Sequence, residues 1–376
     1  MRFADNRNKI GKYIPAVVFL IFIYGMALWF IFSPKPDYSS SEKRYLQKFP
    51  EVTAEKLLSG DFGSEFETFF ADRFPQRNTW VGLNAYTALA EGNNGASGVY
   101  NCKNGYLINK PVSTENNLDK NIGAVADFAK SIDTPTTVML VPSTGYIVDD
   151  VLPTFHDKYN DDEDISKISS TLSKDKIGFV DLRERFKSEY KNGSQLYYKT
   201  DHHWTTKGAY TGYQELCKAL GITPIDDSTL KKDSYSDFYG TTYSSSGFWL
   251  TPPDNIEIWN NPKNSDRNIS VKITEGANIK TSGSMYFTDH LKEDDKYPVF
   301  IDGNHALTEI TNTNAKNGTI LLIKDSFSHS LAPFLAENYS KVVLVDLRYY
   351  KESVSDLVTT YNPEQVVVLY GIDNLA

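Results

Sequence analysis

Four consecutive residues near the middle of the chain combine a carboxylate, two imidazoles and an indole: Asp201, His202, His203 and Trp204. On extended backbone, residues two apart share one face, so Asp201 can orient the His203 ring. The second ring nitrogen of His203 can then take a proton from a nucleophile. On the same spacing His202 is expected to point the opposite way and to be structural or to face substrate.

A serine far downstream is the candidate nucleophile. Ser326 follows the apolar run TILLI (319–323) and precedes SLAPFLAENY, a pattern typical of a helix. A strand-to-helix turn can project the hydroxyl from a sheet, while free N–H groups of the following helix face a developing oxyanion. Serine commonly caps helices, however, and either Ser326 or Ser328 can do so here. Position alone therefore leaves the nucleophile open.

The Asp-His-His sequence also raises a metal-binding alternative. A metal site needs three or four converging ligands, and the other histidines, His156, His290, His305 and His329, include no pair at a metal-type spacing. DHH-type phosphoesterases share the three letters, but the chain has no companion Asp-x-Asp strand end. We therefore expect no metal, and the triad chemistry requires no cofactor.

Short apolar runs indicate the elements that must position these side chains. Five runs are separated by helix-length segments: TTVMLV (136–141), IGFVDL (177–182), TILLI (319–323), KVVLVD (341–346) and QVVVLY (365–370). Runs that are apolar on both faces predict a mostly parallel sheet with helices on both sides, so the fold class is α/β. Sites in such sheets form at the carboxyl ends of strands. The looser pattern between Leu250 and His305 predicts a β-rich or irregular insert.

The N-terminal segment determines the expected compartment. Tyr13 to Phe32 contains no charge and has about the length that a helix needs to cross ~30 Å of hydrocarbon. The polar residues that follow offer no small-residue cleavage site, so we expect a retained anchor rather than a cleaved signal peptide. The residues before it carry more basic than acidic side chains, which predicts a cytoplasmic N-terminus and an exported remainder.

This interpretation divides the chain into a cytoplasmic tail (1–12), a transmembrane anchor (13–33), a juxtamembrane stalk (34–95) and an extracytoplasmic domain (96–376). The net charge is -9, and the tail contributes +3 of its own, which leaves -12 outside. Such a surface repels nucleic acid. Cys102 and Cys217 both fall on the exported side, where a disulfide is possible but not determined by the sequence.

Seven segments of the exported part resemble a known family in their order. They are SEKRYLQKFP (41–50), DRFPQR (72–77), GVYNCKNGYLI (98–108), VPSTGYIVDDVLP (141–153), DHHW, YPVFIDGNHALTEI (297–310), and LLIKDSFSHSLAPFL followed by VVLVDLRYY. The chain is similar to the DHHW proteins, relatives of the alginate O-acetylation proteins in the SGNH-hydrolase-like superfamily. The resemblance covers most of the exported chain and implies an SGNH-like fold.

The resemblance also implies a catalytic triad. In that superfamily the Asp and His come from a D-x-H-W motif and the Ser from a downstream segment, which correspond to Asp201, His203 and Ser326 here. Asp325 precedes the serine as in the GDS motif of the wider superfamily. Lys324 stands where glycine is usual, a departure that puts the oxyanion geometry in question.

Three further residues are weaker candidates for binding substrate. Arg348 follows the next strand, Asn304 lies in a Gly-Asn-His sequence, and His202 belongs to the motif itself. Either Arg348 or Asn304 could hold a substrate or an oxyanion. Ion pairing of the arginine and turn formation by the asparagine are their more common roles.

The sequence thus predicts a membrane-anchored, extracytoplasmic O-acetyltransferase acting on a cell-surface or secreted polysaccharide. One helix cannot carry an acetyl donor across a membrane, so the family resemblance implies a membrane-bound O-acyltransferase as the supplier. Two alternatives stay open. A carbohydrate acetyl esterase would use the same triad with water as the acceptor, and a non-catalytic polysaccharide-binding or assembly subunit would keep only the fold.

Overall fold

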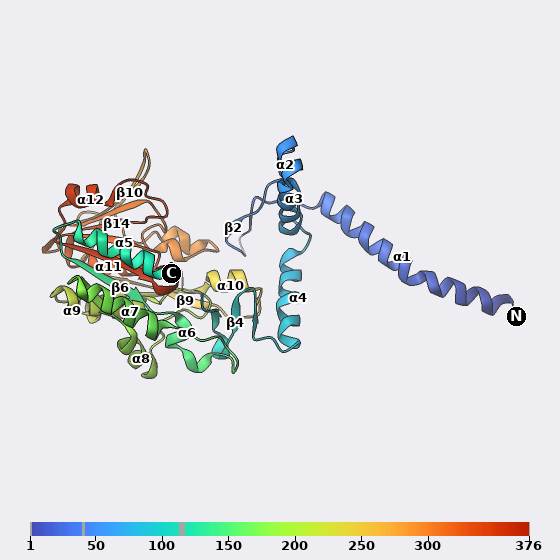
Figure 1. The fold of residues 1–376 in the computed structure, drawn as a ribbon, viewed down its shortest axis with the longest axis horizontal. Coiled ribbons are helices and arrows are strands. Elements are labelled where there is room, and N and C mark those ends of the chain that lie inside the picture. Colours follow the sequence, from blue (N-terminus) through green and yellow to red (C-terminus); the bar gives the residue numbers. More distant parts are fainter. Residues whose placement is uncertain (1, 40–41, 113–116, 376) are drawn as a thin grey trace. The chain divides into compact units, whose positions relative to one another are not determined.

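The computed structural model describes residues 2–39, 42–112 and 117–375. It consists of two units, Met1–Tyr86 and Thr87–Ala376. The first unit begins with α1, which Figure 1 shows as one long helix. The helices and short strands of this N-terminal part are α1 (Arg2–Phe32), β1 (Tyr38–Ser39), β2 (Arg44–Tyr45), α2 (Ala54–Ser59), α3 (Asp61–Asp72) and α4 (Arg77–Ala90).

The apolar segment of α1 agrees in extent with the predicted membrane span. Within the described residues, one helical segment, Tyr13–Phe32, is long and apolar enough to cross a membrane. Length and composition fit both a membrane anchor and a signal sequence at this position.

The DRFPQR segment holds the polar chain after α1 against the end of α3. The buried carboxylate of Asp72 accepts hydrogen bonds from Arg44 Nη1 at 2.9 Å and from the Gln47 amide at 2.9 Å. Arg73 Nη1 donates to the Pro36 carbonyl at 2.6 Å. Asp72 and Arg73, an acid and a base at the end of α3, thus both bind the chain that follows α1. This motif therefore has a structural role.

An eight-stranded sheet forms the centre of the second unit, in the order β11-β10-β12-β14-β13-β15-β6-β7. The five strands from β14 to β7 run parallel, and β12, β10 and β11 continue the sheet with antiparallel pairings. The bounds are β6 (Thr136–Val141), β7 (Gly178–Asp181), β10 (Ile269–Glu275), β11 (Asn278–Ser282), β12 (Leu307–Asn312), β13 (Asn317–Lys324), β14 (Tyr339–Val345) and β15 (Gln365–Gly371). The five predicted apolar runs are the five parallel strands, which confirms the α/β class.

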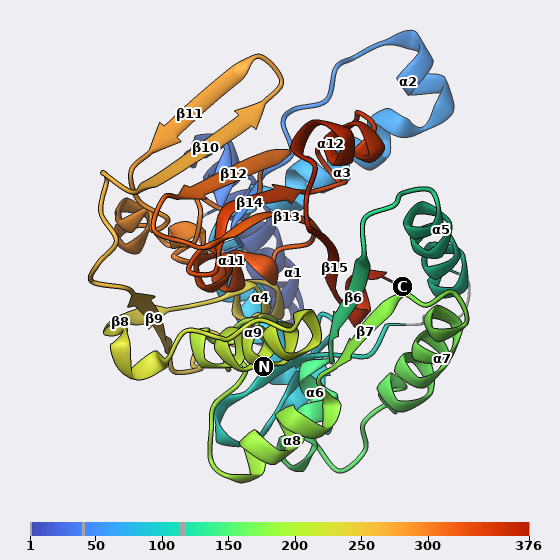
Figure 2. The same cartoon turned by 90° about the vertical axis from the view of Figure 1, so that its left-hand side faces the viewer.

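Helices cover both faces of this sheet, as Figure 2 shows. Successive residues of a central strand enter different cores: Leu322 joins the cluster that includes α9 and α11, whereas Leu321 joins the cluster that includes α5, α7 and α12. Burial on both faces explains the uninterrupted apolar runs. The helices are α5 (Leu118–Lys130), α6 (Thr144–Ile147), α7 (Asp161–Lys174), α8 (Arg183–Lys191), α9 (Thr206–Leu220), α10 (Thr241–Ser246), α11 (Ser328–Leu335), α12 (Val354–Tyr361) and α13 (Ile372–Leu375).

The region from Leu250 to His305 is rich in β-structure as predicted, but much of it belongs to the central sheet. The antiparallel hairpin of β10 and β11 extends that sheet at its edge. In β10, Ile269, Val271 and Ile273 are buried and alternate with more exposed residues. A half-exposed strand has no continuous apolar run, which is why the sequence pattern suggested a separate insert. A second antiparallel pair joins β8 (Lys231–Phe238) to β9 (Asp254–Asn260).

A small sheet lies on the N-terminal side of the second unit, formed by β3 (Gly95–Ala96), β4 (Val99–Asn101) and β5 (Leu107–Asn109). Cys102 lies between β4 and β5 and Cys217 lies in α9. Both are buried free thiols. Burial raises the pKa of each thiol to about 12, so neither is reactive as a thiolate in the folded chain.

Candidate active site

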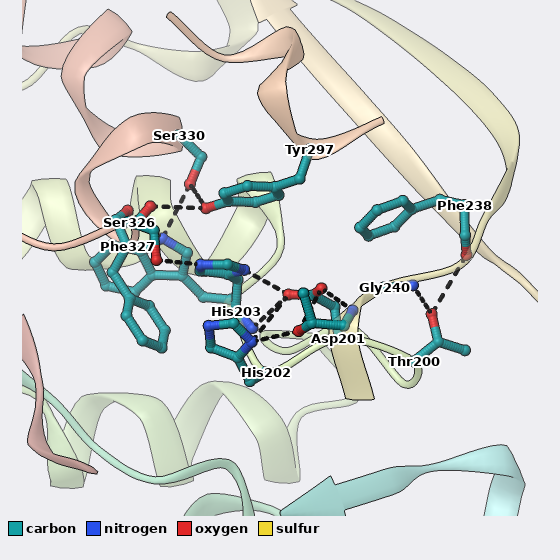
Figure 3. Close-up of polar contacts among 12 residues, drawn as sticks. Thr200, Asp201, His202, His203, Phe238, Gly240, Tyr297, Ser326, Phe327 and Ser330 are labelled. Atoms are coloured by element: carbon teal, nitrogen blue, oxygen red, sulfur yellow. Dashed lines mark hydrogen bonds and ion pairs between the residues drawn. The ribbon is translucent and has the colours of Figure 1, made fainter. Parts of the chain in front are cut away.

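Asp201, His203 and Ser326 form a continuous chain of hydrogen bonds in the second unit (Figure 3). His203 Nε2 lies 2.7 Å from Ser326 Oγ, and His203 Nδ1 lies 2.5 Å from Asp201 Oδ1. The three residues expose 4%, 7% and 1% of their surface for His203, Ser326 and Asp201. Residues 123 positions apart are therefore brought into direct contact away from bulk water.

The Asp201 carboxylate is held from two sides. Its Oδ1 accepts the His203 amide at 2.9 Å as well as the ring, while Oδ2 accepts the Thr241 amide at 2.7 Å and the Thr241 hydroxyl at 3.2 Å. A carboxylate against Nδ1 places the ring proton there, which leaves Nε2 as the acceptor that faces Ser326. This is the tautomer that a general base needs.

The backbone of the DHHW segment bends at residues 201–203 instead of forming a strand. Alternation of side chains applies to strands, so the expectation that His202 points the opposite way is wrong. The two imidazole rings lie 3.8 Å apart between centroids, and His202 Nδ1 is 2.6 Å from Thr241 Oγ1. Figure 3 shows His202 beside His203, and its side chain is about one-third exposed.

A second loop supports the bend from outside the motif. Thr200 donates its amide and its hydroxyl to Asp254 Oδ2, both at 2.7 Å, and its Oγ1 accepts the Gly240 amide at 3.1 Å. A Cβ on Gly240 would lie 2.1 Å from the Asp201 Cβ, so only glycine permits this approach. No sequence motif identified Gly240, Thr241 or Asp254 as residues of this site. Only the fold places them next to Thr200 and Asp201.

Asp325 fixes the turn that carries Ser326. Its Oδ1 accepts the Phe327 amide at 2.9 Å, and its Oδ2 accepts the Gly371 amide and Asn374 Nδ2, both at 2.7 Å. Burial raises the pKa of this carboxyl, and the Asn374 and Gly371 donors oppose the rise. The Asp-Ser pair is thereby tied to the end of β15, the neighbouring parallel strand.

The helix after Ser326 offers fewer free amides than expected. The Phe327 and Ser328 amides donate to Asp325, and the His329 amide donates to the Ser326 carbonyl at 3.2 Å. Within the described residues, the amide of Ser326 itself has no acceptor. The first two amides of α11 are therefore engaged, and the Ser326 N–H is an open donor for an oxyanion.

Two aromatic side chains pack around the histidine and the serine. The Tyr297 ring stacks on the His203 ring with centroids 4.0 Å apart and an interplanar angle of 9°, and its hydroxyl donates to the Ser326 carbonyl at 3.2 Å. Trp204 is fully buried and donates from Nε1 to the Phe327 carbonyl at 2.9 Å. Trp204 thus has a packing role, whereas Tyr297 carried no signal in the sequence.

Lys324 lies in a buried charged network next to the serine turn. Its Nζ is 2.8 Å from His329 Nε2 and 3.1 Å from Asp346 Oδ2. Arg348 pairs with Asp346 at 2.7 Å and donates to Asn304 Oδ1 at 2.9 Å. Burial lowers the pKa of both Lys324 and His329. In the described part of the chain, Arg348 and Asn304 contact this network and each other, and no hydrogen bond joins them to the triad.

A cation is a poor fit to the three motif residues. One ligand atom from each of Asp201, His202 and His203 lies within 4.8 Å of the others. Both nitrogens of His203 already contact Asp201 and Ser326, however, and His202 Nδ1 contacts Thr241. Binding a metal would break the hydrogen bonds that orient the histidine.

A small cleft of about 70 Å³ opens beside the triad. His202 and Phe327 form one side of it. Residues that follow β6 and β15 line it as well, including Ser143, Thr144, Gly145, Asp373 and Asn374, together with the residues of β5. The cleft therefore lies at the carboxyl ends of neighbouring parallel strands, where ligands bind in open α/β sheets.

Comparison with known proteins agrees with this fold. The family model for DHHW proteins matches residues 112–345. A DHHW family protein from Eubacterium siraeum has a TM-score of 0.62 at 18% identity, covering 74% of this chain and 92% of that chain. PatB1 of Bacillus cereus, in a structure with a sulfonyl adduct, has a TM-score of 0.60 at 20% identity, covering 74% and 95%.

A more distant match is the O-acetyltransferase domain of Pseudomonas putida AlgJ, with a TM-score of 0.48 at 14% identity over 74% of this chain and 92% of that domain. No curated protein matches the chain. Since the family model spans more than half of the sequence, the chain belongs to the DHHW family.

Proposed function

We propose that the chain is an O-acetyltransferase that acts on a polysaccharide through Asp201, His203 and Ser326. The observation that carries this proposal is the unbroken contact from the carboxylate through the imidazole to the serine hydroxyl. A serine held 2.7 Å from an unprotonated ring nitrogen is an activated nucleophile. A binding subunit that kept only the fold would have no need of this geometry.

The first half-reaction acylates the serine. Ser326 Oγ attacks the acetyl carbonyl while His203 Nε2 takes its proton, and Asp201 stabilises the resulting imidazolium. The oxyanion accepts a hydrogen bond from the Ser326 amide. His203 then returns the proton to the leaving oxygen as the carbon–oxygen bond breaks, which leaves acetyl-Ser326 and a neutral histidine.

The second half-reaction transfers the acetyl group. A sugar hydroxyl attacks the acetyl carbonyl, His203 Nε2 takes the hydroxyl proton, and the same proton returns to Ser326 Oγ as the serine leaves. Water in place of the sugar would make the enzyme a carbohydrate acetyl esterase. The chemistry of the triad is the same, so the acceptor decides between the two.

The apolar segment of α1 supports a location at the cell membrane. We propose a single-pass anchor at 13–33 with a cytoplasmic tail at 1–12, a stalk at 34–95 and an extracytoplasmic domain at 96–376. The acetyl donor would then have to reach the outer side, and a membrane-bound O-acyltransferase is the proposed supplier. Acetylation of a cell-surface or secreted polysaccharide is consistent with this placement.

Acylation of Ser326 tests the proposal directly. The purified full-length chain in detergent is incubated with a chromogenic acetyl ester, and peptides are examined by mass spectrometry. We expect one acetyl group on Ser326 and none in the Ser326→Ala variant, while Ser328→Ala keeps the modification. Absence of acylation from every donor tested would favour the non-catalytic subunit.

A further inference from the structure

A groove lined with lysines lies next to the catalytic cleft. It has a volume of about 930 Å³, and Ile147 of α6 forms part of its wall. Thr144 and Gly145, from the same short helix, line the cleft beside the triad. α6 contacts both β5 and α8, and this one short helix contributes residues to the walls of both hollows.

Three lysines of this groove form no ion pair with a carboxylate among the residues that the structure describes. Lys187, Lys191 and Lys199 all line it. Within the described residues, none of the three has a carboxylate at ion-pair distance. Lys187 and Lys199 are also half-buried. Unpaired lysines gathered in one groove favour an anionic ligand.

The side chains near these three lysines limit the kind of anion that the groove can bind. Lys187 Nζ lies 3.6 Å from the centre of the Tyr146 ring. Two tyrosines, Tyr106 and Tyr190, line the groove itself, and the Tyr190 hydroxyl donates to Asp150 Oδ1 at 2.6 Å. Aromatic rings combine an apolar face with a polar edge, as sugar rings do. With Asp149 and Asp150 also present, the lysines exceed the acids by one, in a chain whose net charge is -9.

We propose that this groove binds a segment of an acidic glycan that carries carboxylate or phosphate groups. The inference rests on the proposed function and names its substrate class. An acidic protein surface repels polyanions at long range. Unpaired lysines in one place are therefore needed to bind a polyanion. Lys199 lies two residues before Asp201, which would place the bound segment next to the sugar that receives the acetyl group.

Binding of defined oligomers tests the groove without any need for turnover. The probes are a polygalacturonate oligomer, a poly(glycerol phosphate) oligomer and a neutral cello-oligomer of equal length, titrated calorimetrically into the full-length Ser326→Ala chain. In that background, the triple variant Lys187→Gln, Lys191→Gln, Lys199→Gln should bind the acidic oligomers about tenfold more weakly. Raising the salt concentration should weaken binding to the unmodified groove.

A matched triple variant controls for total charge. Lys174, Lys263 and Lys316 are exposed lysines outside the groove, and replacing all three by Gln should change binding by less than about twofold. The single variant Lys191→Gln, at an exposed position, should weaken binding about twofold and keeps the test valid if the triple variant misfolds.

The probe that binds identifies the charged group, carboxylate or phosphate. Equal binding of the neutral oligomer, or equal weakening by both triple variants, would overturn the inference. Acylation of Ser326 in the active chain is measured separately. Acylation of Ser326 without binding of the acidic oligomers would contradict only the proposed glycan-binding groove. Binding of the oligomers without acylation would contradict only the proposed function.

Discussion

At the residue scale, the adjacent histidines differ in what their ring nitrogens contact. One ring nitrogen of His203 is hydrogen-bonded to the Asp201 carboxylate, and the other is hydrogen-bonded to the Ser326 hydroxyl. His202 contacts Thr241 and keeps part of its ring exposed. The two histidines therefore differ in their hydrogen-bond partners even though the rings lie side by side.

This inequality predicts different effects of removing each ring. His203→Ala should lower the rate of acetyl-ester turnover by a factor on the order of 10³ or more, because it removes the base and the acid. His202→Ala should retain much of the rate. Steady-state kinetics of both variants check this. Equal, complete loss in both, reversed by added zinc or manganese, would instead indicate a metal site.

Gly240 offers a test of how closely Asp201 is enclosed. A methyl group at Gly240 meets the Asp201 side chain at 2.1 Å, so Gly240→Ala should displace the carboxylate and lower turnover at least about 10²-fold. Gly123 in α5 has nothing within 4 Å of an added Cβ, and Gly123→Ala should leave turnover unchanged. Full turnover in Gly240→Ala would show that the loop relaxes freely.

At the element scale, the sequence indicated the parallel strands and missed the antiparallel ones. β13 and β15 are apolar on both faces, a pattern that can be recognised without the fold. β10 buries alternate residues, so its pattern resembles that of irregular chain. The site follows the same division: Ser326 lies in the turn after a recognisable strand, whereas Gly240, Thr241 and Tyr297 come from distant segments whose proximity only the fold determines.

The start of α7 provides a pH-dependent contact between elements. Asp161 is buried, its Oδ1 accepts the Ser143 amide at 2.7 Å, and burial raises the pKa of its carboxyl to about 7. Between about pH 4 and 7 the unfolded chain has lost this proton while the folded chain keeps it. The contribution of Asp161 to stability therefore falls as the pH rises through this window.

Asp161→Asn should remove that dependence. We expect the wild-type chain to lose at most about 3 kcal/mol of unfolding free energy between pH 5 and 8 from this group, and the variant to lose less. Denaturant unfolding at the two pH values measures the difference. The same pH dependence in both proteins would exclude a titration of Asp161.

At the scale of the whole molecule, the apolar segment of α1 decides how the chain is held. An uncleaved anchor predicts that the mature protein retains residues 13–32 and sediments with membranes. A signal sequence would leave a soluble chain that begins after this segment. N-terminal mass spectrometry of protein from the membrane and soluble fractions distinguishes the two, and a mature chain lacking residues 13–32 would contradict the anchor.

The direction of acetyl transfer is the central claim of the proposed function. Water reaches any exposed site, so a transferase must align its acceptor hydroxyl well enough for sugar attack to outpace hydrolysis. In the proposed function, the cleft beside His202 and the lysine groove are the surfaces that would bind this acceptor.

The most direct measurement follows a labelled acetyl group from Ser326. The full-length chain is acetylated on Ser326 with an isotopically labelled donor, and its discharge is timed with and without glycan oligomers. We predict faster discharge when a cognate glycan is present, with the label recovered on the glycan. Discharge at one rate regardless of glycan, with all label recovered as free acetate, would contradict the transferase and indicate the esterase.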